Sequence, residues 1–181
     1  HMDIVLLMIE KGANDWNTGM MTTCWSGHAD IVLFMIEKGA NNWNHGMRCA
    51  CHGGHMEIVL LMIENGEDDW NWGMACACRG GHMDIVLLMI EKGANNWNQG
   101  MTRACEGGHV EIVKFMVEKG ANEWNLLKRI DDFKLYKIYI QKTGRKDDTK
   151  YENLLKRHPV YQLMLFKKLH IGLIRELHKY L

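Results

Sequence analysis

The chain has 181 residues, and its 22 Lys and Arg are balanced by 22 Asp and Glu. A hydrophobic content of 47% with 24% charged residues indicates a globular chain and excludes a disordered one. The zero net charge argues against a polybasic nucleic-acid binder. The first apolar run, Ile4 to Ile9, is too short for a secretory signal or a membrane-spanning helix. The six cysteines are therefore expected to be thiols of an intracellular, cytoplasmic protein.

The chain repeats itself with a period of 27 residues, without an insertion. Five near-copies begin at His1, His28, His55, His82 and His109. The fourth copy reads HMDIVLLMIEKGANNWNQGMTRACEGG, and the fifth departs from this pattern after Asn125. A repeat of this length predicts a solenoid, in which each unit buries its apolar face only by stacking on its neighbours.

Each copy predicts two short helices. The first, called the outer helix, runs from Asp3 to Lys11 in copy one, and Gly12 is its expected left-handed cap. The second, called the inner helix, is expected to follow Asn17 as its N-cap and to end near Ser26, where Gly27 closes it. The glycines are thus interpreted as helix punctuation. Because the chain starts on an outer helix, further repeats upstream are expected.

The string A-C-x-G-G-H-M-E/D-I-V-x-x-M-I-E-x-G-A-N resembles the ankyrin repeat over residues 1–125. Ankyrin units run to about 33 residues, so these are six residues shorter, between Ala13 and Met20, where the projecting finger would lie. Glycines stand where the family has a proline, at Gly19, Gly46, Gly73 and Gly100. The resemblance implies an all-α, ankyrin-like helix-turn-helix solenoid, similar to finger-less ankyrin proteins of large nucleocytoplasmic DNA viruses. A leucine-rich repeat would require an Asn ladder with alternating leucines, and this pattern is missing.

Comparison of the copies separates expected core from expected surface. Trp16, Met20 and Cys24 recur in every inner helix at i, i+4, i+8 and are predicted to be core. The positions that vary, Thr18, Met21, Thr22 and Trp25 in copy one, form an i, i+3, i+4, i+7 stripe and are predicted to tile a concave partner-binding face. Its candidate residues are Trp25, His45, Arg48, His52, Trp72, Arg79, Gln99, Arg103 and Glu106. Ala75, Cys49 and Cys76 belong to the same stripe.

The outer helices carry a second expected surface. Leucine occupies one exposed position in four copies, at Leu6, Leu33, Leu60 and Leu87, and Lys114 occupies it in the fifth. An apolar ridge on the convex side is predicted, and its occupant could be a missing segment, a neighbour or nothing.

The sharpest candidate for a metal site is the string Cys49, Cys51, His52 and His55. Cys51 is a repeated core position, and His55 is a repeated turn position, so these side chains are expected on different faces and no metal site or cofactor is predicted. Cys49 and Cys76, one row apart, could bridge under oxidation, but nothing nearby would activate them. No phosphate loop, H-E-x-x-H or nucleophile elbow is present, and the chain is not predicted to be an enzyme.

The repeats carry a net charge of −8 over residues 1–125 and the tail carries +8 over residues 126–181, so neutrality conceals two opposed modules. Helices are expected at 126–141 and, broken at Pro159, at 151–181, and the tail is interpreted as a C-terminal helical cap of the stack. The segment KLHIGLIRELHKYL faintly resembles the start of an F-box at Leu169, Leu173, Ile174 and Leu177.

The main function predicted for the chain is binding of a partner protein. One version of this prediction is a viral protein that binds a host factor. The alternatives are a ubiquitin-ligase adaptor that acts through this tail and nucleic-acid contact through the basic tail. No membrane partner is expected.

Overall fold

A computed structural model describes residues 1–124, 132–144 and 148–157, and in these ranges every regular element is an α-helix. The chain divides into two compact units, His1–Asn122 and Glu123–Leu181. None of the described helices is long and apolar enough to cross a membrane. The expected all-α repeat architecture is confirmed.

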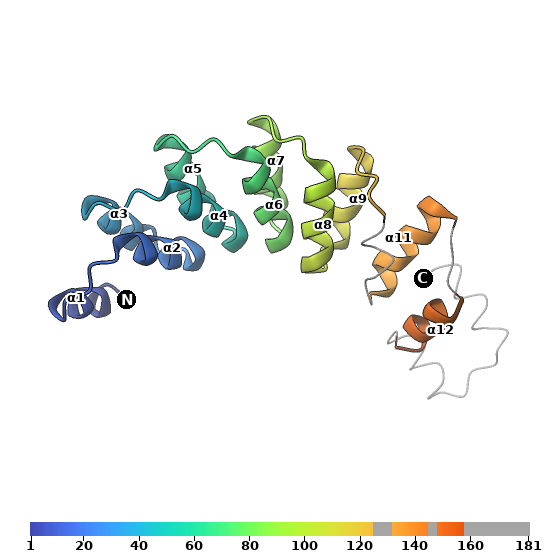
Figure 1. Ribbon diagram of the computed structural model, residues 1–181, viewed down its shortest axis with the longest axis horizontal. Coiled ribbons are helices and arrows are strands. Elements are labelled where there is room, and N and C mark those ends of the chain that lie inside the picture. Colours follow the sequence, from blue (N-terminus) through green and yellow to red (C-terminus); the bar gives the residue numbers. More distant parts are fainter. Residues whose placement is uncertain (125–131, 145–147, 158–181) are drawn as a thin grey trace. The chain divides into compact units, whose positions relative to one another are not determined.

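The first unit consists of two layers of helices (Figure 1). The outer layer contains α1 (Met2–Glu10), α3 (Ala29–Glu37), α5 (Met56–Glu64), α7 (Met83–Glu91) and α9 (Val110–Glu118). The inner layer contains α2 (Trp16–Ser26), α4 (Trp43–Gly53), α6 (Trp70–Gly80) and α8 (Trp97–Gly107). Inner helices pack on their inner neighbours, and each packs on the outer helix that follows it in the chain. The packed pair is therefore an inner helix and the next outer helix.

The start of the inner helix differs from the prediction. The helix begins at Trp16, and its N-cap is Asp15, whose Oδ1 accepts a hydrogen bond from the Thr18 backbone N–H at 3.0 Å. Asn42, Asp69 and Asn96 cap the other inner helices in the same way. An Asp or Asn one residue before the tryptophan is placed to accept from the amide at the third helical position. The prediction of Asn17 as the cap is therefore wrong by two residues.

Asn17 and its equivalents instead tie one repeat to the next. Asn17 Oδ1 accepts from the backbone N–H groups of Asn41 and Asn42 at 2.9 and 3.0 Å. Asn71 Oδ1 accepts in the same way from Asn95 and Asn96, both at 2.9 Å. Asn98 Oδ1 accepts a hydrogen bond from the backbone N–H of Asn122 at 2.7 Å. In the loop that follows α5 the buried Glu67 accepts from the Asp69 amide at 3.0 Å, and no such tie from Asn44 is seen in the described residues.

The core lies between the two layers and consists mainly of methionine, cysteine and branched aliphatic side chains. Each complete pair buries a Met and a Cys from its inner helix, with an Ile, a Val and a Met from its outer helix, as in Met47, Cys51, Ile58, Val59 and Met62. Of the predicted core residues, the tryptophans are only half-buried. Because Trp97 is the first residue of α8, its ring lies at the helix end, where its Cδ1 approaches Gly120.

One set of glycines packs rather than punctuates. A Cβ added at Gly73, in the interior of α6, would lie 2.6 Å from Met89 Sδ of the following outer helix. Glycine at this position therefore permits a close approach between the two layers, and the interpretation of these glycines as punctuation is wrong. The caps are as predicted, since Gly27 ends α2 at φ 81° in the left-handed region.

The second unit contains α11 (Phe133–Thr143) and α12 (Asp148–Arg157). Asp132 caps α11 through the Leu135 amide at 2.9 Å, and Gly144 ends it at φ 65°. The buried side chains of this unit include Leu135, Ile138 and Leu154. Within the described residues the helix predicted for 126–141 is seen from Phe133 to Thr143, and α12 begins at Asp148, three residues before the predicted helical segment 151–181. Pro159 and the F-box-like residues at 168–181 lie outside the described residues.

Candidate functional site

The predicted partner-binding residues lie on the four inner helices, and none is fully buried. We call this set the inner-helix surface. Four of its side chains are exposed, namely Trp25, His45, Arg79 and Glu106, and five are half-buried, namely Arg48, His52, Trp72, Gln99 and Arg103. Trp25, at 58% exposure, is the only tryptophan among the large exposed hydrophobic side chains in the described part of the chain. Ala75, expected on the same stripe, is instead buried within the stack.

Trp72 occupies the middle of this surface, between two arginines. The Arg48 guanidinium carbon lies 4.8 Å from the centre of the Trp72 ring, and that of Arg103 lies 5.5 Å from it. Arg48 comes from α4 and Arg103 from α8, the two inner neighbours of α6. Both distances are within the range of a cation–π interaction. Three successive repeats therefore position one aromatic ring and two cations.

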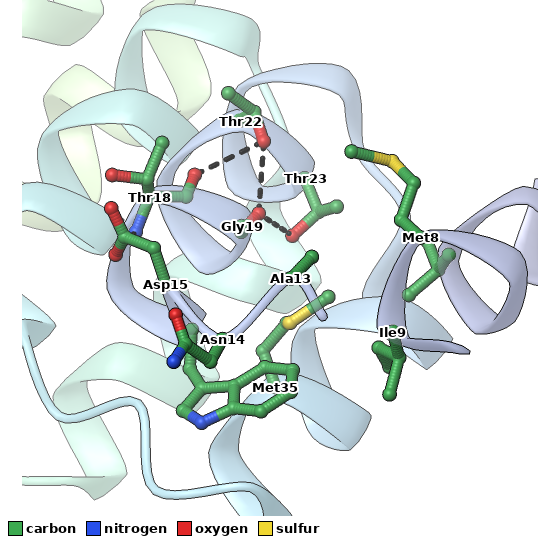
Figure 2. A pocket seen from close by; sticks show the side chains of 12 residues that line it. Met8, Ile9, Ala13, Asn14, Asp15, Thr18, Gly19, Thr22, Thr23 and Met35 are labelled. Atoms are coloured by element: carbon green, nitrogen blue, oxygen red, sulfur yellow. Dashed lines mark hydrogen bonds between the residues drawn. The ribbon is translucent and has the colours of Figure 1, made fainter. Parts of the chain in front are cut away.

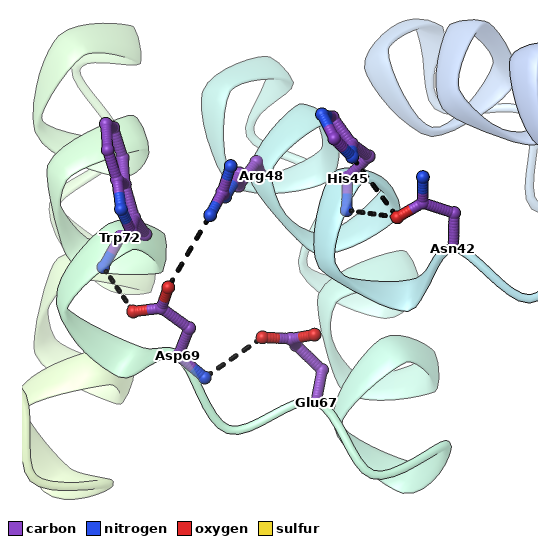
Figure 3. Close-up of polar contacts among 6 residues, drawn as sticks. All are labelled: Asn42, His45, Arg48, Glu67, Asp69 and Trp72. Atoms are coloured by element: carbon purple, nitrogen blue, oxygen red, sulfur yellow. Dashed lines mark hydrogen bonds and ion pairs between the residues drawn. The ribbon is translucent and has the colours of Figure 1, made fainter.

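Two carboxylates hold the arginines. Arg48 Nη2 lies 3.6 Å from Asp69 Oδ2, and the other Asp69 oxygen accepts from the Trp72 backbone N–H at 3.2 Å (Figure 3). Glu106 lies 2.9 Å from Arg103 Nη1 and 3.9 Å from Arg79 Nε. Asp69 was not predicted from the sequence, although a carboxylate at an N-cap position, three residues before a surface tryptophan, is a group that can also orient a cation.

Polar atoms of the surface retain hydrogen-bonding capacity. Arg48 Nε and His52 Nδ1 are buried and have no hydrogen-bond partner among the described residues. Other members of the surface are held locally, because His45 Nδ1 lies 3.2 Å from Asn42 Oδ1 and Gln99 Oε1 accepts from Asn96 Nδ2 at 3.2 Å. The centre around Arg48 and Trp72 therefore differs from the edges in having unsatisfied polar groups next to an aromatic ring.

The thiols near this surface are held in the neutral form. Burial raises the pKa of Cys49, and it raises that of Cys76 although the positive charges of Arg48 and Arg103 oppose it. In the core, burial raises the pKa of Cys24, Cys78 and Cys105 to about 12. Since the thiolate is the nucleophile, none of these groups has the character of a reactive cysteine. All six cysteines are free thiols.

The metal-like string is spread over different environments. Cys51 is buried in the core, whereas Cys49 and His52 are half-buried. His55 Nε2 lies 3.0 Å from the backbone carbonyl oxygen of Trp25, in the last turn of α2. Within the described ranges, no group of three or more His, Cys, Asp or Glu is arranged to hold a metal ion. The same contact recurs in the next two repeats. His82 Nε2 lies near the backbone carbonyl oxygen of His52, and His109 Nε2 lies near that of Arg79.

A pocket of about 510 Å³ lies between α1 and α2 and was not predicted (Figure 2). Met8 and Ile9 of α1 line one side, and Gly19 and Thr22 of α2 line another. In the next inner helix the matching glycine, Gly46, approaches Cys24 of the preceding inner helix. In α2 the face that contains Gly19 lines the pocket instead. The residues that line the pocket are mainly apolar, so the pocket could hold an apolar group but does not present a set of catalytic side chains.

These features define an all-α repeat solenoid that presents a mixed aromatic and charged surface from its inner helices. Residues 46–126 match the family model described as Ankyrin repeats (3 copies). This match covers the Trp72 centre and includes α6 and α8, so the expected ankyrin resemblance is confirmed for that part of the chain. No curated protein matches the sequence significantly.

Proposed function

We propose that the inner-helix surface binds a segment of a partner protein, with Trp72 and its two arginines at the centre of the contact. Ankyrin repeats are generally protein–protein interaction modules and typically act as non-enzymatic scaffolds, and residues 46–126 match that family. The observation that carries the proposal is that the guanidinium groups of Arg48 and Arg103 both lie within cation–π distance of the half-buried Trp72 ring. Tryptophan and arginine dominate the energetics of protein interfaces.

The arrangement favours binding because it is already formed in the free protein. Asp69 and Glu106 hold the arginine side chains, and helical backbone holds Trp72, so little side-chain freedom remains to be lost on contact. Arg79 is the most adaptable cation, since its side chain is 54% exposed and lies 3.9 Å from Glu106. A partner carboxylate could replace that weak pairing at little cost.

The test begins by identifying a partner through its contact with this surface. A photo-crosslinking amino acid at His52 or Arg79 is expected to capture a partner protein, whereas the same group at Lys119, the exposed residue that follows α9 in the outer layer, serves as the control. With the captured partner purified, Trp72→Ala is expected to weaken the affinity by at least about tenfold. Trp70→Ala changes the same residue type two positions earlier and is expected to lower stability with little change in affinity.

Two outcomes would contradict the proposal. One is equal capture at the inner-helix positions and at Lys119, and the other is an affinity that Trp72→Ala and Arg79→Ala leave unchanged while the helical circular dichroism signal is retained. The adaptor and nucleic-acid alternatives both depend on the tail, whose F-box-like residues lie outside the described residues. These alternatives, a viral origin with a host partner, and a cytoplasmic location stay predictions.

A further inference from the structure

The outer layer carries a row of exposed leucines. Leu6, Leu33, Leu60 and Leu87 occupy the same position in α1, α3, α5 and α7, and their exposures lie between 44% and 49%. A single exposed leucine needs no explanation, but an exposed leucine at the same position of four successive outer helices repeats an apolar feature along the outer layer. We call this row the leucine ridge.

Carboxylates bracket every leucine of the ridge. Asp30 and Glu37 stand three residues before and four residues after Leu33, and Glu57 and Glu64 stand likewise around Leu60. Residues at these spacings share one helical face. The two carboxylate rows are seven residues apart, which at 1.5 Å per residue is about 10 Å, close to the diameter of an α-helix. All of these carboxylate side chains are exposed.

The outer layer is acidic throughout the ridge. Its four leucine-bearing outer helices, with the residue that follows each, carry eight carboxylates and three lysines, Lys11, Lys38 and Lys92, so their net charge is −5. One of these lysines, Lys38, lies over the Phe34 ring at 5.2 Å. The ridge ends at α9, where Lys114 replaces the leucine and pairs with Glu111 at 2.8 Å. Four helices spaced about 8–10 Å apart give a ridge about 24–30 Å long, the length of a helix of about 16–20 residues.

We propose that the leucine ridge binds a basic amphipathic helix of a partner protein. Leucines at i, i+3 and i+4 on that helix would cover the ridge, and lysines or arginines on both flanks would meet the two carboxylate rows. A second copy of this chain would bring its own carboxylate rows against these, and an anionic membrane would be repelled by them. The described tail helices offer few free apolar side chains, because Leu135, Ile138 and Leu154 are already buried.

The probe for the test is a synthetic 20-residue peptide with a leucine seam flanked by lysines, titrated against the full chain by fluorescence anisotropy. Leu60→Lys recreates the arrangement of the fifth repeat, in which a Glu three residues earlier pairs with the lysine, so the helix is expected to be retained. This variant is expected to weaken peptide binding at least tenfold. Lys114→Leu extends the ridge onto α9 and is expected to strengthen binding severalfold.

The matched control is Asn65→Lys. It adds the same charge to the same repeat at a position where other repeats already have Lys11, Lys38 and Lys92. It is expected to change peptide affinity by less than about twofold, and a peptide with glutamate flanks is expected not to bind. Equal weakening by Leu60→Lys and Asn65→Lys would overturn the proposal, because nonspecific charge would then explain the binding. It would also be overturned if Leu60→Lys abolished self-association in sedimentation, or if it abolished binding to phosphatidylserine vesicles.

Discussion

The guanidinium carbon of Arg48 lies 4.8 Å from the centre of the Trp72 ring, and the two residues come from neighbouring inner helices. Asp69 links the pair, because one of its carboxylate oxygens forms an ion pair with Arg48 and the other accepts a hydrogen bond from the Trp72 backbone N–H. The contact between the two residues therefore belongs both to the stacking of repeats and to the surface proposed to bind a partner.

The Arg48–Trp72 contact is expected to contribute to stability by itself. In a double-mutant cycle of Arg48→Ala and Trp72→Ala, urea unfolding should give a coupling energy of about 0.5–1 kcal/mol. Arg48→Lys should lose part of this coupling, since lysine lacks the planar group that stacks on the ring. A cycle of Trp72→Ala with Lys114→Ala on α9 serves as the control and should be additive. Additivity for both pairs would show that the ring and the guanidinium do not interact.

The asparagine ties between repeats are expected to be stabilising. Asn71→Ala removes the acceptor of two backbone hydrogen bonds, from Asn95 and Asn96, and should lower the free energy of unfolding by about 1–2 kcal/mol. Asn44→Ala alters the matching position in α4, for which no such tie is seen in the described residues, and should change stability little. Urea midpoints of the two variants provide the comparison. Hydrogen exchange should also speed up at the Asn95 and Asn96 amides in Asn71→Ala alone.

Glycine at the end of an inner helix is expected to be required for stacking. A Cβ at Gly80 would overlap the backbone carbonyl oxygen of His52, which cannot move without its helix. Although alanine is the better helix former by about 1 kcal/mol, Gly80→Ala should destabilise the chain by about 1–3 kcal/mol. At Gly73 the obstacle is the flexible Met89 side chain, so Gly73→Ala should cost less. The reverse order in thermal or urea unfolding would contradict this packing.

The buried thiols predict a loss of stability in alkali. Burial raises the pKa of Cys24, Cys78 and Cys105 from 9.0 to about 12. Between these values the unfolded chain loses thiol protons that the folded chain retains. Their contribution is therefore complete below pH 9 and declines as the pH rises toward 12, by up to about 1.4 kcal/mol per pH unit for each thiol. The urea concentration at the unfolding midpoint should fall from pH 8 through pH 9 to pH 10. This decrease should be smaller in Cys78→Ala than in the unchanged chain. A pH-independent midpoint would refute the assignment.

The repeated residues predicted some structural features well and others poorly. The methionine and cysteine positions of the inner helix are core as predicted, because a small or flexible apolar side chain present in every copy has one common use. The repeated tryptophans are half-buried, because a residue in the first turn of a helix meets a loop rather than the opposite layer. Position in the helix, which the cap at Asp15 determines, decided this difference.

By itself, the sequence determined the period, the alternation of two short helices, the left-handed glycine caps and the variable stripe that runs along the inner helices. These follow from local rules, namely helical periodicity and the freedom of glycine at positive φ. Tertiary structure alone decided that Asn71 binds the backbone of a loop 24 residues later, that Gly73 admits Met89, and that Trp72 lies between Arg48 and Arg103. Each of these contacts joins different repeats. A single repeat records which residue recurs, but only the spacing and rotation between stacked repeats decide what that residue meets.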